Sequence, residues 1–136
     1  MDNTDKNSNS YKIFLWIYAT IYILAGFNHL ISPKGYFEIM PQWIPFHGLL
    51  IYLSGVIEII LGILLLFPKT IKVSSLFIIL MLIAFLPIHI DMIQRAPFTL
   101  GKIYVTPFIA WVRLPLQFLL IGWAYYYFGN ARKLSL

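Results

Sequence analysis

Four long apolar stretches dominate the sequence and leave few folds open to it. They run over residues 13–31, 48–67, 73–90 and 103–131. Within them the only formally charged residues are Glu58 and Arg113. A helix of about 20 apolar residues crosses the hydrocarbon core of a bilayer. A membrane β-barrel would instead alternate polar and apolar residues, which these stretches do not do. The sequence therefore predicts four membrane-spanning helices.

The composition supports this interpretation. Hydrophobic residues make up 60% of the 136 residues and charged residues 11%, against roughly 45–50% and 25% in ordinary globular domains. A domain this small has too little interior to hide so much apolar surface from water. We expect an all-α integral membrane four-helix bundle, a single domain over residues 1–136. The expected spans cover about residues 12–31, 48–67, 72–92 and 106–128.

The outer connection over residues 32–47 reads as a structured loop, because it holds three prolines and several aromatic residues suited to the headgroup layer. The link from Pro68 to Lys72 is very short, so the second and third helices are expected to be antiparallel neighbours.

The distribution of Lys and Arg predicts the orientation in the membrane. With four spans both termini lie on one side, and that side carries Lys6, Lys12, Lys69, Lys72, Arg132 and Lys133. The other side carries Lys34, Arg95 and Lys102. Because cytoplasmic loops are enriched in cations, we expect both termini in the cytoplasm, in a multi-pass protein of the bacterial inner membrane. The first apolar helix is expected to be retained, since a cleavable signal has a basic start and a shorter core.

Several kinds of chemistry are excluded by residue type. The chain has no cysteine, which excludes disulfides, thiolate metal sites and iron–sulfur clusters. The net charge of +5 comes from cations near the span ends, which favours a role in orientation over nucleic-acid binding. No nucleotide, flavin or metal-binding motif is present, so we expect no intrinsic cofactor and no metal site.

Two charged residues are expected inside the spans, where the hydrocarbon core makes a charge energetically costly. Glu58 is ten residues into its span, about 15 Å deep, and Arg113 is six to ten residues into the fourth, about 9–15 Å deep. An unpaired charge at that depth is costly, so the sequence predicts a Glu58–Arg113 ion pair. Ser54 and Gly62 share the helical face of Glu58, and Gln117 shares that of Arg113.

Further polar residues lie near the outer ends of the spans. Asn28 and His29 close the first span, and His89 follows Pro87 near the end of the third. We expect a pocket open to the outside. Its polar lining is predicted to comprise Asn28, His29, Ser54, Glu58, His89, Arg113 and Gln117. The alternative is structural: the ion pair only fixes helix register, and the histidines are hydrogen-bonded interfacial residues.

Four stretches, taken in order, carry a resemblance to a known family. They read AGFNHLISPKGYFEIMPQWIP, YLSGVIEIILGILLLFP, FLPIHIDMI and WVRLPLQFLLIGWAYYY. Together they cover about residues 13–127 and resemble the DoxX-like membrane proteins, a family related to DoxD and MauE. The runs SGVIE and RLPLQ are the most telling parts. The resemblance implies a four-helix transmembrane bundle whose polar positions include His29, Glu58, His89, Arg113 and Gln117.

The resemblance also implies a role beside redox systems. Relatives include the membrane subunit of a thiosulfate:quinone oxidoreductase and proteins that assist the maturation of methylamine dehydrogenase, while more distant ones act as cargo receptors or chaperones. The chain departs from thiol-handling members because it has no cysteine.

Three functions stay open at this stage. The first is an accessory or anchor subunit of a redox system that binds a quinone, without catalytic activity on its own, beside an oxidoreductase partner or a second copy. The second is a non-catalytic scaffold or chaperone that binds a partner helix. The third is a small proton-coupled transporter. A haem held by His29 and His89 is disfavoured.

Overall fold

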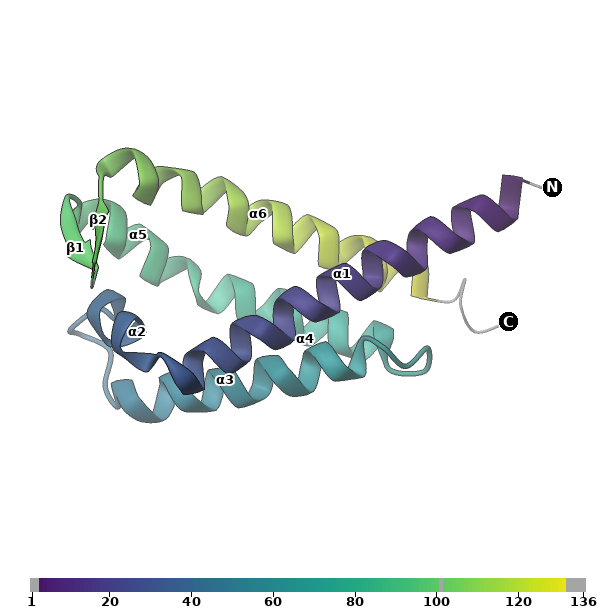
Figure 1. Ribbon diagram of the computed structural model, residues 1–136, viewed down its shortest axis with the longest axis horizontal. Helices are drawn as coiled ribbons and strands as arrows, with labels where there is room; N and C mark the ends of the chain where they lie inside the picture. Colours follow the sequence, from purple (N-terminus) through teal and green to yellow (C-terminus); the bar gives the residue numbers. More distant parts are fainter. Residues whose placement is uncertain (1–2, 101, 132–136) are drawn as a thin grey trace.

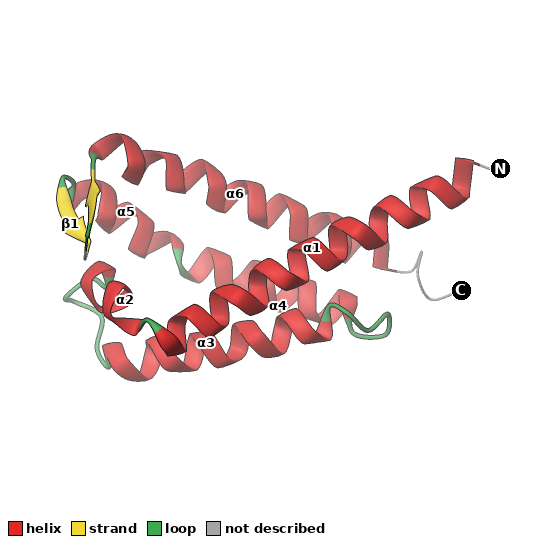
Figure 2. Cartoon of the chain, in the orientation of Figure 1, coloured by secondary structure: helices red, strands yellow, loops and turns green. Residues whose placement is uncertain are grey.

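The computed structural model describes residues 3–100 and 102–131, and most of the chain forms helices that run along one axis (Figures 1 and 2). The elements are α1 (Asn3–Ile31), α2 (Pro33–Ile39), α3 (His47–Leu64), α4 (Ile71–Ala84), α5 (Leu86–Arg95), β1 (Phe98–Leu100), β2 (Ile103–Val105) and α6 (Pro107–Asn130). Of the cations that predict the orientation, Arg132 and Lys133 lie outside the described residues.

The predicted helical spans are confirmed in number and approximate position. In the described part of the chain, four segments are long and apolar enough to cross a membrane: Asn9–Ile31, His47–Leu64, Ile71–Arg95 and Pro107–Asn130. Length and composition support this statement; insertion, orientation and the bacterial inner membrane stay predictions.

The third span differs from the continuous helix predicted for residues 72–92. It is broken between α4 and α5, immediately before Pro87. A proline has no N–H to donate and clashes with the preceding turn, so the break has a local cause. The outer loop is structured, as predicted, because it contains α2. The sequence did not predict the hairpin in which β1 and β2 pair antiparallel, with Phe98 opposite Val105.

The helices pack as two pairs. α1 packs mainly on α3, and α6 packs on α4 and α5, while α3 and α4 are joined by a short turn and also contact each other. The start of α1 and the end of α6 lie at one end of the molecule, which we call the terminal end (Figure 1). α2 and the β-hairpin lie at the opposite end, the hairpin end.

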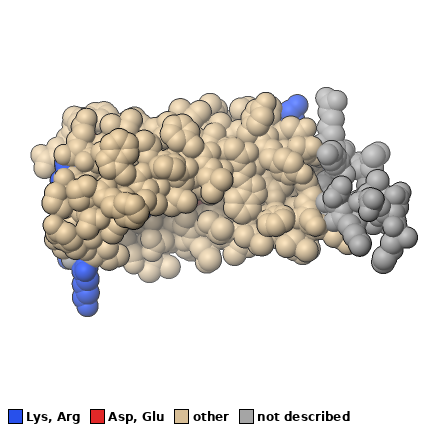
Figure 3. Space-filling model, turned by 90° about the horizontal axis from the view of Figure 1, so that it is seen from above, with Lys and Arg blue, Asp and Glu red and all other residues tan. Residues whose placement is uncertain are grey.

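Much of the surface is apolar, and several polar side chains are buried. Leu24, Phe118 and Leu119 are 63%, 56% and 65% exposed, whereas Glu58 and Gln117 are 5% exposed. Figure 3 shows one face on which Lys and Arg are confined to the two ends of the long axis. Water would penalise so large an apolar surface, and lipid would not. The fold is therefore suited to a bilayer.

Glycines bring α1 and α3 into close contact. A Cβ atom on Gly26 would lie 2.6 Å from the Gly55 carbonyl oxygen, and one on Gly55 would lie 2.6 Å from the His29 Cβ. Further along the pair, a Cβ on Gly62 would lie 2.6 Å from Ile23 and 3.0 Å from the Ala19 carbonyl oxygen. Small residues permit such backbone approach between helices in lipid, as the sequence predicts for this face of α3.

Aromatic side chains join α1 to α6 nearer the terminal end. The Tyr18 hydroxyl donates to the Leu120 carbonyl at 3.1 Å. Its ring packs edge-on against Trp123 with centroids 4.7 Å apart, and Tyr127 is also buried in this cluster. The two helices are therefore held together by rings and by hydrogen bonds to backbone carbonyls.

The substitution Gly26→Val tests the close packing of α1 on α3. The added side chain meets backbone atoms, which cannot rotate away, so we expect the two helices to separate and stability to fall by about 1–3 kcal/mol. Thermal unfolding in detergent measures this. Gly122→Val is the matched control, because a Cβ at Gly122 meets nothing within 4 Å. Equal melting temperatures for the two variants would contradict the packing.

Candidate functional site

The centre of the site is a pair of buried ionisable side chains on α1 and α3. His29 Nε2 lies 3.6 Å from Glu58 Oε2, and the two side chains are 10% and 6% exposed. The Glu58 oxygen makes no hydrogen bond within the described chain. The Gly26–Gly55 contact brings the pair this close, since His29 lies one turn after Gly26 on α1 and Glu58 lies one turn after Gly55 on α3.

Backbone hydrogen bonding favours one tautomer of His29. Its Nδ1 lies 3.2 Å from the Ile51 carbonyl oxygen, which can only accept, so Nδ1 carries a proton. The Ser54 hydroxyl donates to the same carbonyl at 2.9 Å and lies 3.0 Å from Nδ1. In a neutral imidazole the lone pair is then on Nε2, facing Glu58.

With Nδ1 protonated, the contact between His29 and Glu58 is favourable when the pair shares one further proton. Two facing lone pairs on Nε2 and Oε2 would repel each other, and an isolated carboxylate is costly to bury. A proton on either His29 or Glu58 removes both penalties and leaves the pair without net charge. The arrangement suits proton exchange with a molecule bound beside it.

Tyr36 covers this pair from the hairpin end. Its ring centroid lies 3.8 Å from that of His29, and its hydroxyl accepts a hydrogen bond from the Asn28 amide at 2.7 Å. Burial raises the pKa of the Tyr36 phenol; the Asn28 hydrogen bond lowers it, Glu58 raises it and Arg113 lowers it. Both charged residues of the spans thus act on the Tyr36 phenol.

The predicted Glu58–Arg113 ion pair is wrong. Within the described chain no carboxylate oxygen lies within 4.0 Å of the Arg113 guanidinium, which instead donates to the Met92 sulfur at 3.7 Å. The physical reason is the pairing of helices. α6 packs on α4 and α5, whereas α3 packs on α1, so His29 takes the place beside Glu58 that was predicted for Arg113.

Gln117 satisfies a backbone carbonyl at the break between α4 and α5. Its amide donates to the Leu82 oxygen at 2.7 Å, and both residues are buried. Because α4 ends two residues beyond Leu82, a side chain substitutes for the missing helical donor. The role of Gln117 in this structure is to support the break.

His89 lies near Arg113 and Gln117. Its Nδ1 is buried and makes no hydrogen bond within the described chain. The predicted site residues thus form two groups. We call His29, Ser54 and Glu58 the acid–base cluster, and His89, Arg113 and Gln117 the donor cluster; Asn28 joins the first through Tyr36.

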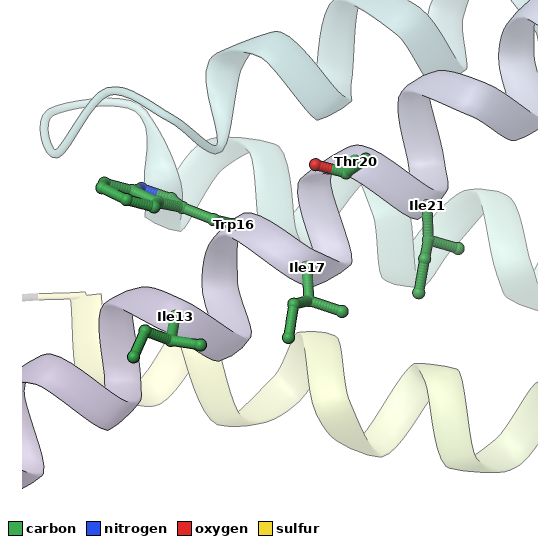
Figure 4. Close-up of a pocket in the computed structure, with 5 residues that line it drawn as sticks. All are labelled: Ile13, Trp16, Ile17, Thr20 and Ile21. Atoms are coloured by element: carbon green, nitrogen blue, oxygen red, sulfur yellow. The ribbon is translucent and has the colours of Figure 1, made fainter.

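A hollow of about 350 Å³ lies elsewhere, on the outer surface of α1. Figure 4 shows the side chains that line it, Ile13, Trp16, Ile17, Thr20 and Ile21. These residues lie on consecutive turns of α1, on one side of the helix, and belong to the apolar outer surface of the bundle. This hollow includes none of the predicted site residues.

Sequence reasoning missed two polar features. Tyr36 was treated only as an interfacial aromatic residue, although its position one helical turn after Pro33 in a structured loop was a usable signal. Ser74 and Ser75 are fully buried on α4, and the Ser74 hydroxyl donates to the Leu61 carbonyl at 2.6 Å. The half of the bundle nearer the termini is therefore not purely apolar.

One known protein family matches a part of the chain that contains all the residues of the site. The family described as Domain of unknown function (DUF8561) matches residues 18–128. The chain belongs to this family. The DUF8561 match includes both clusters and Tyr36. No curated protein and no solved structure matches the chain. The resemblance to the DoxX-like proteins stays a prediction.

The substitution Gln117→Leu tests the role of Gln117. It leaves the Leu82 carbonyl buried without a donor, so we expect a loss of about 1–2 kcal/mol. Thermal unfolding in detergent measures the loss. Gln94→Leu makes the same change at an exposed position and is expected to have little effect. A melting temperature for Gln117→Leu no lower than that of Gln94→Leu would contradict this role.

A double-mutant cycle tests which residue is coupled to Glu58. Combining Glu58→Gln with His29→Gln is expected to give a coupling energy of about 1 kcal/mol or more, because the side chains touch. Combining Glu58→Gln with Arg113→Met is expected to give less than about 0.5 kcal/mol. Arg113→Met alone should cost far less than the roughly 3–5 kcal/mol typical of a broken buried ion pair. The reverse order of couplings would restore the ion pair.

Proposed function

We propose that this chain is a multi-pass membrane protein with both termini in the cytoplasm, and an accessory subunit of a redox system that binds a quinone. The observation that carries the proposal is the buried His29–Glu58 pair, in which Glu58 Oε2 makes no hydrogen bond within the described chain. Arg113 and His89 supply the second element, since Arg113 donates to the Met92 sulfur at 3.7 Å and His89 Nδ1 makes no hydrogen bond within the described chain.

The chemistry of a quinone matches these two clusters. A quinone has two carbonyl oxygens, and its reduction to a quinol consumes two electrons and two protons. The guanidinium of Arg113 can donate to one oxygen and stabilise negative charge that develops there. The His29–Glu58 pair can deliver a proton and take up another for the second step. The two electrons come from a partner redox protein.

Two further points support this assignment. The apolar surface suits a bilayer, where quinones dissolve, and the resemblance to DoxX-like proteins implies membrane subunits beside oxidoreductases. We propose the bacterial inner membrane as the location, and an oxidoreductase subunit or a second copy of this chain as the partner. The chain is proposed to have no catalytic activity without that partner.

Quinone binding tests the proposal directly. The purified protein is titrated with a short-chain ubiquinone and, separately, a short-chain menaquinone, and the melting temperature is followed. A ligand at 100 times its Kd stabilises the folded state by about 2.7 kcal/mol, so we expect a clear rise with one of the two. Glu58→Gln and Arg113→Met should each weaken binding by about tenfold, as expected for one lost hydrogen bond to a charged group.

Trp111→Leu, an exposed substitution on the same helix as Arg113, is the control and should bind like the parent. The absence of any thermal shift with both quinones, together with no quinone in the lipid extract of the purified protein, would overturn the proposal.

A scaffold function is the second candidate, because one aromatic face of α6 is exposed. Phe108, Trp111 and Tyr125 are 76%, 57% and 67% exposed. The glycine face of α3, in contrast, is covered by α1, so a partner helix would have to bind α6. In that case Glu58→Gln would leave partner retention unchanged, and substitutions of the exposed aromatic residues would abolish it.

Transport is less well supported. Tyr18, Trp123 and Tyr127 pack together between the acid–base cluster and the terminal end, where a transport path would need room. Proton-driven uptake into vesicles that Glu58→Gln abolishes would support a transporter.

A further inference from the structure

The short helix α2 lies over the acid–base cluster, and several of the contacts that hold it there are polar. None of its residues is buried, although Tyr36 stacks on His29. A helix of seven residues is not stable on its own in water, and a segment with few buried contacts opens at low free energy. What holds α2 in place therefore decides how accessible His29 and Glu58 are.

Arg95, from the end of α5, makes the strongest of these contacts. Its Nη1 donates to the Glu38 carbonyl at 3.2 Å and its Nη2 to the Ile39 carbonyl at 2.7 Å. These are the last two carbonyls of α2, where a cation is also favoured by the helix dipole. The guanidinium thus caps a helix that belongs to the other half of the bundle.

Two neighbours orient the Arg95 guanidinium. Its Nε donates to Asp91 at 2.5 Å, one turn earlier on α5, and Phe98 of β1 lies under it with the ring centroid 5.3 Å away. Asp91 and Arg95 are four residues apart on α5, the spacing at which opposite charges on a helix pair. All three nitrogens of the guanidinium are therefore engaged, and two of them bind α2.

The loop that follows α2 carries backbone strain. Phe46 adopts a left-handed conformation with φ 55°, although it is not glycine, and its side chain is 75% exposed. Such a conformation costs of order 1–3 kcal/mol and is typical of segments that switch. The packing of the Phe46 side chain does not offset this cost, because the side chain is exposed.

We propose that α2 is a lid over the acid–base cluster and that Arg95 is its latch. When Arg95 releases the two carbonyls, α2 moves away with Tyr36, and His29 becomes open to the hairpin end. The latch controls entry of the ligand and of protons to the site. The identity of that ligand rests on the proposed function, but the opening of the lid does not.

Thiol labelling tests the latch, because the chain has no cysteine. Ser54→Cys places a thiol beside the imidazole that Tyr36 covers. The labelling rate with a sulfonated maleimide is measured on the full chain in detergent. Adding Arg95→Ala is expected to raise the rate about tenfold, since labelling follows the open population. Arg95→Lys should give a smaller rise, because it keeps the charge and loses the paired donors.

Two controls separate lid opening from other effects. Lys34→Ala removes an exposed cation of α2 itself and should leave the rate within about twofold. Ser75→Cys places a thiol at a fully buried position of α4 and should stay protected unless the protein unfolds. If Arg95→Ala exposes Ser75→Cys as well, Asp91→Asn decides the question. It frees the guanidinium without removing it and should raise Ser54→Cys labelling about threefold while Ser75→Cys stays protected.

Unchanged Ser54→Cys labelling in Arg95→Ala, with Ser75→Cys protected, would overturn the latch. The same holds for unchanged labelling in Asp91→Asn when that variant decides. Because these rates are measured without quinone, the latch can fail while quinone binding stands, and quinone binding can fail while the latch stands.

Discussion

The close contact between α1 and α3 determines most of what is chemically unusual in this molecule. Gly26 and Gly55 allow the two backbones to touch, and this contact places His29 beside Glu58 and the Ile51 carbonyl. The carbonyl favours the tautomer with Nδ1 protonated, and in that tautomer a proton shared with Glu58 removes the repulsion between facing lone pairs. A steric property of two glycines thus leads to an acid–base property of two side chains several ångströms away.

Lipid makes the same demand on every polar group in the bundle, since it offers no hydrogen bonds. Several buried polar side chains meet this demand by donating to backbone carbonyl oxygens: Gln117 donates to Leu82, Ser74 to Leu61 and Tyr18 to Leu120. Three buried side-chain atoms make no hydrogen bond within the described chain: Glu58 Oε2 and His89 Nδ1, which belong to the two clusters, and Ser75 Oγ, which lies on α4 outside them. Polar residues alone do not mark a site, because most of them are satisfied.

The helical spans could be predicted from the sequence because length and apolar composition are local properties. The list of polar residues was also within reach, since each one violates an otherwise apolar stretch. Which of these polar residues contact one another could not be predicted, because the sequence gives the depth of each residue in the membrane but not which helices are neighbours. Glu58 and Arg113 were placed at similar depths, and nothing in the spacing showed that α6 would pack on α4 and α5. Gln117 was assigned to a pocket for the same reason, although the break before Pro87 gives it a structural partner.

The acid–base cluster lies on the pair α1 and α3, whereas the donor cluster lies on α5 and α6. The boundary between these two helix pairs, which we call the seam, therefore separates the two clusters. At the hairpin end the two pairs are joined by hydrogen bonds from Arg95 of α5 to carbonyls of α2. The charges of Glu58 and Arg113 both shift the pKa of the Tyr36 phenol. A buried ion pair across the seam would neutralise both charges permanently and would leave nothing for a ligand to bind. With His29 beside Glu58, no carboxylate of the described chain pairs with Arg113, and its one hydrogen bond there is to the Met92 thioether. A bound molecule with an oxygen at each end would then make the connection between the helix pairs that the protein itself does not make.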